Sequence, residues 1–326
     1  MLGRLAESLY GLAATAYHRR WDRRGGTRVA VPVISVGNLT VGGNGKTPFV
    51  IELVRVLREH FPDLCERHRI AVLSRGYGRH SGELCVVEAE SHWTDSGDEP
   101  LLIKRSCPDT LVIAHARRLE SARMAIDRFD SKLIILDDGF QHRALARDLD
   151  LVLLDAHKPL GNGRLLPVGP LREPVTALER ATHLVSVGTG GEVASLAERF
   201  DRPMFAVEPR PLSDIWPDRP VGPVFLLTGV ARPERVRSFL EFAGFTVVGH
   251  RAFRDHHAFT EAELHSVAET AGRSGAATVL TTAKDAVRIP AWDGSLPLEV
   301  CPYELRLSAP EALVECVACL FSHDVV

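Results

Sequence analysis

The chain lacks a dense or regularly spaced set of cysteines. Only six occur in 326 residues, at the scattered positions Cys65, Cys85, Cys107, Cys301, Cys316 and Cys319. Disulfide-stapled secreted domains need patterned cysteines, and the N-terminus shows no convincing secretory signal, so we expect reduced thiols in a cytoplasmic protein. Cys316 and Cys319 form a lone C-x-x-C in an apolar, helix-like segment, which indicates packing rather than zinc or redox chemistry.

The chain also lacks an excess of either charge. Its formal net charge is −3, which gives no global electrostatic reason to expect a nucleic-acid partner. It contains no internal repeat and no low-complexity tract. An apolar fraction of 45% and a charged fraction of 25% are ordinary for a soluble globular protein, and 326 residues suffice for two domains.

No apolar run is long enough to predict a transmembrane helix. The nearest candidate is the segment 1-28, which Arg4 and Glu7 interrupt. Its apolar residues fall near one helical face and its arginines follow: Leu2, Leu5, Leu9, Leu12, Ala13 and Ala16, then Arg19, Arg20, Arg23, Arg24 and Arg28. Two interpretations stay open. The segment is either an interfacial membrane helix with its arginines on anionic headgroups, or an amphipathic helix packed on the protein.

The chain does contain a phosphate-binding loop in the expected setting. An apolar, β-branched stretch at 31–36 predicts a buried strand, and Pro48 opens a segment with helical apolar spacing. Between them lie Thr40, Val41, Gly42, Gly43, Asn44, Gly45, Lys46 and Thr47, in which Thr40 replaces the first glycine of the usual motif. Such a loop cradles phosphates with backbone N–H groups, while Lys46 reaches the β/γ-phosphates and Thr47 ligates Mg²⁺.

Strand-like runs alternate with helix-like patterns through residues 29-208. Runs at 70–74, 111–114, 133–136, 151–154 and 183–187 read as strands, and 117–129 reads as a helix. This alternation predicts an α/β fold of the P-loop NTPase type, with a mostly parallel sheet flanked by helices.

Prolines then mark 209-223 as a linker. We expect a smaller α/β domain over 224-306, contributing to the active-site cleft, and a final helix within 307-326 whose docking partner the sequence does not assign.

Acidic and histidine-containing clusters add candidate chemistry. The apolar run 133–136 ends in Asp137 and Asp138, and parallel strands bring such carboxylates beside the phosphate loop, where they can reach Mg²⁺. Asp98 and Glu99 lie in a Gly/Pro-bounded loop, and His256 lies between aromatics at 253–259. A carboxylate or carboxylate–His pair can deprotonate an attacking hydroxyl, although spacing alone is not specific for this role.

Seven sequence blocks in order resemble the tetraacyldisaccharide 4′-kinase family, and the resemblance spans nearly the whole chain. The blocks are VISVGNLTVGGNGKTP (33–48), LSRGYGR (73–79), GDEP (97–100), DDGFQH (137–142), GPLREP (169–174), FRDHHAFT (253–260) and TTAKDAVR (281–288). The resemblance implies a P-loop kinase domain and ATP-dependent, Mg²⁺-dependent phosphorylation of a lipid A precursor at its 4′-hydroxyl. The acceptor would be a tetraacyldisaccharide 1-phosphate, met at the cytoplasmic face of the bacterial inner membrane through the N-terminal helix, with no obligate protein partner.

The resemblance also implies roles for individual residues. Asp98 would help to deprotonate the sugar hydroxyl with His256 as its dyad partner, and the distance between them in sequence suggests closure of the two domains over the substrates. Glu99, His142, Asp137 and Asp138 would serve the Mg²⁺ and γ-phosphate side, with Lys46. Arg75, Arg118 and Arg172 would bind substrate, since guanidinium groups grip phosphate with two donors.

Two other functions remain as alternatives. A membrane-associated P-loop ATPase or GTPase would act as a switch or assembly factor, although no Asn-Lys-x-Asp guanine motif is present. A cytosolic small-molecule kinase would have an N-terminal helix that merely packs. These motifs make a purely structural protein a poor interpretation.

Overall fold

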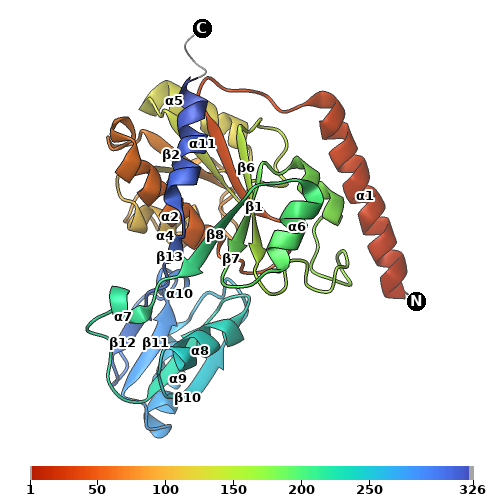
Figure 1. The fold of residues 1–326 in the computed structure, drawn as a ribbon. Coiled ribbons are helices and arrows are strands. Elements are labelled where there is room, and N and C mark those ends of the chain that lie inside the picture. Colours follow the sequence, from red (N-terminus) through yellow and green to blue (C-terminus); the bar gives the residue numbers. More distant parts are fainter. Residues whose placement is uncertain (1, 323–326) are drawn as a thin grey trace.

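The computed structural model describes residues 2–322, which form a large body built on one sheet and a smaller body built on another (Figure 1). Met1 and residues 323–326, which end the two terminal segments expected from the sequence, lie outside the described residues. The α/β fold with a mostly parallel sheet is confirmed.

The large sheet has nine strands in the order β13-β8-β7-β6-β1-β5-β2-β4-β3. Its seven inner strands are parallel, and the short edge strands β3 and β13 are antiparallel to their neighbours. The strands are β1 (Val33–Asn38), β2 (Ile70–Ser74), β3 (Cys85–Val86), β4 (Leu111–Ala114), β5 (Leu133–Asp137), β6 (Leu149–Asp155), β7 (His183–Val187), β8 (Met204–Pro209) and β13 (Leu305–Leu307). The central strands are buried along their whole length, as expected for a parallel sheet covered on both faces.

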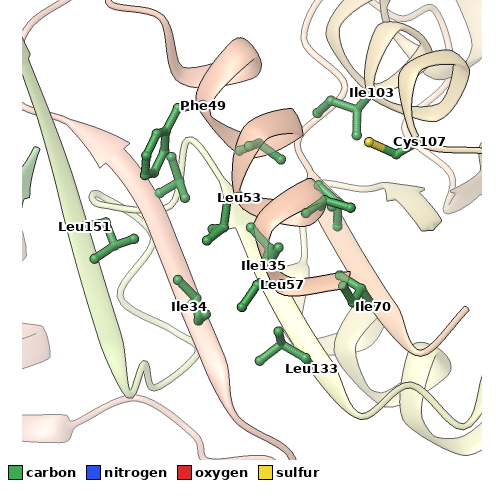
Figure 2. Close-up of a cluster of buried hydrophobic side chains, with 14 of the residues drawn as sticks. Ile34, Phe49, Leu53, Leu57, Ile70, Ile103, Cys107, Leu133, Ile135 and Leu151 are labelled. Atoms are coloured by element: carbon green, nitrogen blue, oxygen red, sulfur yellow. The ribbon is translucent and has the colours of Figure 1, made fainter. Parts of the chain in front are cut away.

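Helices cover both faces of this sheet. On one face lie α2 (Lys46–His60), α4 (Asp98–Ser106) and α11 (Pro310–Ser322); on the other lie α5 (Arg118–Phe129) and α6 (Glu192–Phe200). Figure 2 shows the first core, where Phe49, Leu53 and Leu57 of α2 point toward Ile34 and Ile135. Ile134 and Leu136 face the opposite core, because successive side chains of a strand alternate between its faces. This packing fixes the carboxyl ends of β1 and β5, which lie side by side where the phosphate loop begins.

The smaller body is built on four parallel strands in the order β10-β9-β11-β12. The strands are β9 (Val224–Thr228), β10 (Val247–Ala252), β11 (Thr278–Thr282) and β12 (Leu298–Cys301). Helix α8 (Pro233–Phe242) packs on one face and α9 (Glu261–Arg273) on the other. The short helices and turns are α3 (Trp93–Ser96), α7 (Leu212–Ile215) and α10 (Ala283–Ala286), with 3₁₀ turns at Pro62–Leu64 and Val175–Arg180.

The chain returns to the large body earlier than expected from the sequence. Residues 305–307 form β13, which pairs with β8 in the large sheet, whereas the smaller domain was expected to run over 224-306. A three-residue strand is too short for its alternation to be recognised beforehand. The C-terminal helix α11, whose docking the sequence left open, packs Leu313 and Val317 into the same core as α2.

Helix α1 (Leu2–Arg24) lies along the side of the large body (Figure 1). Polar contacts attach it: the Tyr10 hydroxyl donates to the Arg172 carbonyl at 2.9 Å, His18 Nε2 lies 3.0 Å from Glu173, and Arg143 reaches Asp22 at 2.7 Å. Leu5, Leu9 and Leu12 of this helix stay exposed, at 61%, 60% and 69%. Within residues 2–322 no helix is long and apolar enough to cross a bilayer.

Candidate active site

The phosphate loop joins β1 to α2 and is held from both sides. Gly45 precedes α2 with a φ of 75°, and its carbonyl accepts the Phe49 N–H at 3.0 Å. Thr40 is buried, and its hydroxyl accepts a hydrogen bond from Asn44 Nδ2 at 2.6 Å across the loop. The threonine in place of the first glycine is therefore a structural part of this loop. The Val41 N–H donates to the Pro170 carbonyl at 2.8 Å, which ties the loop to the GPLREP segment.

Two carboxylates lie at the end of β5, next to this loop. Asp137 aligns with Val36 of β1 and is buried, with the Ser74 hydroxyl donating to its Oδ2 at 3.0 Å. Burial, together with Glu99 and Asp138, raises the pKa of Asp137 to about 7. Asp138 follows with a φ of 51°, where Lys46 Nζ is 3.4 Å and Arg172 Nη1 is 2.9 Å from its oxygens. Burial opposes ionisation of Asp138, but these two cations lower its pKa overall.

Asp98 and His256, far apart in sequence, are hydrogen-bonded between the two bodies. His256 Nδ1 lies 2.8 Å from Asp98 Oδ2. Asp98 begins α4 after Gly97, which has a φ of 90° and whose added Cβ would lie 3.0 Å from the Gly76 Cα. The glycines of the GDEP and RGYG segments thus permit a close approach that positions Asp98. Burial opposes ionisation of Asp98, but His256, Lys284 and Arg288 lower its pKa.

His256, rather than Asp98, lies on the wall of the cavity. The Asp98 side chain is 3% exposed. Its Oδ1 accepts a hydrogen bond from the backbone N–H of Glu99 at 2.9 Å. With the Nδ1 proton donated to Asp98, Nε2 of His256 is left as an acceptor. The pair already meets in this structure, so closure of the two bodies is not needed to assemble it.

Three residues of the TTAKDAVR segment belong to this site, and residue-level sequence reasoning missed them. Lys284 Nζ lies 2.9 Å from Glu99 Oε1 and 3.3 Å from Nε2 of His256. Burial alone would lower the pKa of Lys284, but the surrounding carboxylates raise this pKa above its ordinary value. Arg288, fully buried, donates to the carbonyls of Gly229 and His257 and pairs with Asp285; its Nε is 3.3 Å from Asp98 Oδ2.

The other candidate residues border the same space. Arg75, Arg118 and His142 line the cavity. Burial and the neighbouring arginines (Arg118, Arg147 and Arg75) lower the pKa of His142 to about 4, so its imidazole is neutral near pH 7. Arg118 is buried and donates to the Ala116 carbonyl at 3.0 Å; burial lowers its pKa to about 10, which leaves it charged. His257 contacts Glu263 at 3.0 Å and stacks on Phe253, a structural role.

These residues surround a cavity of about 1800 Å³ between the two bodies, walled by the phosphate loop, the end of β5, His256 and Lys284. Part of α1, including Tyr10 and Tyr17, also lines it. The volume exceeds the ~300–1,000 Å³ of an ordinary small-ligand pocket, so it has room for a nucleotide and a large second substrate. The phosphate loop and His256, which is backed by Asp98, both line this cavity and are the parts that phosphoryl transfer to a hydroxyl requires.

Known proteins share both the sequence and the fold. The family model for tetraacyldisaccharide-1-P 4′-kinase, LpxK, matches residues 1–321. The chain belongs to the tetraacyldisaccharide 4′-kinase family. It is 41% identical over 308 residues to the 4′-kinase of Anaeromyxobacter sp. strain Fw109-5, covering 87% of this chain and 81% of the relative. It is 40% identical over 283 residues to the 4′-kinase of Aeromonas hydrophila, with 85% and 79% covered.

A solved structure agrees with this membership. The "apo" form of LpxK from Aquifex aeolicus, crystallised in complex with ATP, matches with a TM-score of 0.75 and 30% identity, covering 98% of this chain and 100% of that one. The family resemblance seen in the sequence is thus confirmed, and the protein is a phosphotransferase. The interpretation as a switch or assembly ATPase or GTPase is not favoured.

Proposed function

We propose that this 4′-kinase transfers the γ-phosphate of ATP to the 4′-hydroxyl of a tetraacylated glucosamine disaccharide 1-phosphate, giving the 1,4′-bisphosphorylated lipid A precursor. Among the geometric features, the Asp98–His256 hydrogen bond supports this function best, because His256 lines the same cavity as the phosphate loop. An ATPase that transfers phosphate to water does not need a base facing so large a cavity beside the nucleotide site. Transfer to the hydroxyl of a sugar substrate does need one.

The residues at the end of β5 fit Mg²⁺. No cluster of three or more His, Cys, Asp or Glu side chains within residues 2–322 is arranged to hold a metal alone. Mg²⁺ in nucleotide sites typically uses one or two carboxylates and the substrate phosphates, and Oδ1 of buried Asp137 has no hydrogen-bond partner among the described residues. Thr47, Asp137 and Asp138 would hold the ion. When bound, it would neutralise charge on the phosphates.

The proton and charge steps follow from the positions of the side chains. The acceptor hydroxyl loses its proton to Nε2 of His256 as it attacks, while Asp98 holds the ring orientation and stabilises the imidazolium through Nδ1. For this transfer the Lys284 ammonium moves away from Nε2 of His256, while it remains paired with Glu99. Lys46 neutralises the phosphates. Arg75, Arg118 and Arg172 supply cations for the acceptor's 1-phosphate and the transferred group.

The first experiment follows ³²P from [γ-³²P]ATP into a tetraacylated disaccharide 1-phosphate in detergent micelles with Mg²⁺. We expect a labelled bisphosphorylated lipid. Release of free phosphate with no labelled lipid, under conditions where the Aquifex aeolicus enzyme works, would contradict the proposal. A deacylated, water-soluble acceptor used equally well without detergent would instead favour a small-molecule kinase.

We further propose that α1 attaches the enzyme to the cytoplasmic face of the inner membrane. Its polar contacts hold it on the protein while Leu5, Leu9, Leu12 and its arginines are exposed, which favours an interfacial helix over one that merely packs. The helix also lines the cavity, so an acceptor anchored in the bilayer would enter beside it.

Exchange of the exposed leucines tests this attachment. The triple variant Leu5→Ser, Leu9→Ser, Leu12→Ser should lose at least about tenfold in binding to vesicles of anionic phospholipid, because three apolar side chains no longer enter the acyl boundary. Co-sedimentation measures this. The control variant Val221→Ser, Phe242→Ser removes side chains that are 92% and 94% exposed elsewhere and should bind as wild type. Equal binding by all three proteins would argue against α1 as the anchor.

A further inference from the structure

Arg232, on the smaller body, lies beside Gly42 in the phosphate loop of the large body. It stands at the N-terminal boundary of α8, immediately before Pro233, and lines the cavity. Gly42 of the loop has a φ of 105°, and a Cβ added there would lie 3.3 Å from Nε and 3.5 Å from Nη2 of Arg232. The guanidinium therefore lies against the loop backbone, at a position where a side chain on residue 42 would displace it.

This guanidinium is weakly paired. Within the described chain its ion-pair contact is with Asp155 Oδ2, 3.8 Å from Nη1, which is too long for a hydrogen bond. Asp155 is already satisfied: Oδ1 accepts the backbone N–H groups of His157 and Lys158 at 3.1 and 3.0 Å, and Oδ2 pairs with Arg235. Burial and the neighbouring Arg235 lower the pKa of Arg232, with Asp155 opposing them. The site thus holds a cation whose donors face a loop built for phosphates.

We propose that Arg232 contacts the terminal phosphates of a nucleoside triphosphate in the loop and stabilises the charge that develops during transfer. Arginines that approach a phosphate loop from a second element play this part in other phosphoryl-transfer enzymes. Arg235 is the less suitable candidate because Asp155 already engages it. The inference deepens the proposed function and rests on it.

Arg232 makes and breaks no covalent bond. The bond between the γ-phosphorus and the β–γ bridging oxygen breaks as the acceptor oxygen bonds to that phosphorus. The acceptor proton passes to the Asp98–His256 pair, and the leaving oxygen keeps the bond electrons on ADP. Charge on the transferring oxygens and on the leaving oxygen is what a forked guanidinium can match with two donors.

The test compares Arg232→Ala and Arg232→Lys with wild type in lipid phosphorylation and in nucleotide binding. Arg232→Ala should lower kcat by ~10²-fold with KM for ATP changed by less than about threefold, because the contact strengthens in the transition state. Arg232→Lys should recover part of this loss. The second measurement, independent of turnover, is the affinity for Mg²⁺–ADP with and without aluminium fluoride, a mimic of the transferring phosphoryl group. Arg232→Ala should lose the tightening by aluminium fluoride and keep ordinary ADP affinity.

Arg237→Ala is the matched control, since Arg237 lies on the same helix, exposed and paired with Glu241 at 2.8 Å. It should match wild type in both measurements. An Arg232→Ala enzyme with unchanged kcat and unchanged aluminium fluoride tightening would overturn the inference. Equal losses of ATP and ADP affinity with kcat retained would also overturn it, by making Arg232 a support for the loop. If wild type labels no lipid, the proposed function fails, while the binding comparison still decides the role of Arg232.

Discussion

Asp98→Asn is expected to lower kcat for lipid phosphorylation by ~10²–10⁴-fold while leaving ATP affinity within about threefold of wild type. The amide can still meet Nδ1 of His256, but it carries no charge to stabilise the imidazolium and can favour the wrong tautomer. The buried Asp98 oxygen that contacts His256 also lies 3.3 Å from Arg288, so its charge is balanced in the folded protein. Steady-state kinetics and isothermal titration with ATP separate the two effects.

The control for this variant is Asp95→Asn, three residues earlier on α3, where the carboxylate is exposed. It should retain wild-type kinetics. If Asp98→Asn loses ATP affinity and turnover by equal factors, Asp98 belongs to the nucleotide site rather than to the proton-transfer pair. A thermal melt of each variant guards against misfolding, because removing the charge of Asp98 leaves the buried Arg288 partly uncompensated.

The large sheet could be predicted because its strands are buried on both faces. Predominantly apolar runs such as 70–74 and 133–136 coincide with β2 and β5, since a parallel sheet covered on both faces removes such side chains from water. The strands that were missed are short or half-exposed. Residues 204–209 form β8 although they run into the proline-rich segment, and their burial is uneven. Neither the periodicity nor the composition of so short a segment distinguishes strand from linker.

Local residue patterns predicted the parts of the site that are contiguous in sequence, whereas the Asp98–His256 contact between the bodies was predicted only through the family resemblance. The phosphate loop and Asp137–Asp138 are contiguous motifs with their own signals. Lys284 is different: it contacts Glu99 from 185 positions away, and a lysine in a short helix carries no local sign of that partner. Arg232 is the same case, since only folding brings it to Gly42.

The placement of Arg172 illustrates a further limit. The resemblance implied a substrate-binding role, but here Arg172 pairs with Asp138 and donates to Gln141 at 3.2 Å. A cation beside a carboxylate expected to hold Mg²⁺ is what an electrostatically balanced site needs before its ligands arrive. Arg172 therefore lies where it balances the charge of Asp138 and where it could instead bind a phosphate if Asp138 served as a Mg²⁺ ligand.

Lys46→Ala is expected to lower kcat/KM for lipid phosphorylation by ~10³-fold or more, the second large loss we predict. Lys46 opens α2 directly behind Gly45, and its ammonium lies 3.4 Å from Asp138 Oδ1. The Lys46 ammonium therefore lies where it can exchange its contact with Asp138 for one with the β/γ-phosphates of a bound nucleotide. Alanine removes the phosphate contact and also leaves two adjacent carboxylates with one fewer cation, so affinity for Mg²⁺–ATP should fall as well as kcat.

Lys132→Ala is the matched control. Lys132 directly precedes β5, at the end of that strand away from Asp137 and Asp138, and it pairs on the surface with Asp130. It should behave as wild type. Isothermal titration with Mg²⁺–ATP and ³²P transfer to the lipid acceptor give the two readings. Transfer by Lys46→Ala within tenfold of wild type would remove Lys46 from the phosphate site. In that case arginines that line the same cavity, among them Arg75, Arg118, Arg172 and Arg232, would be left to neutralise the transferred group.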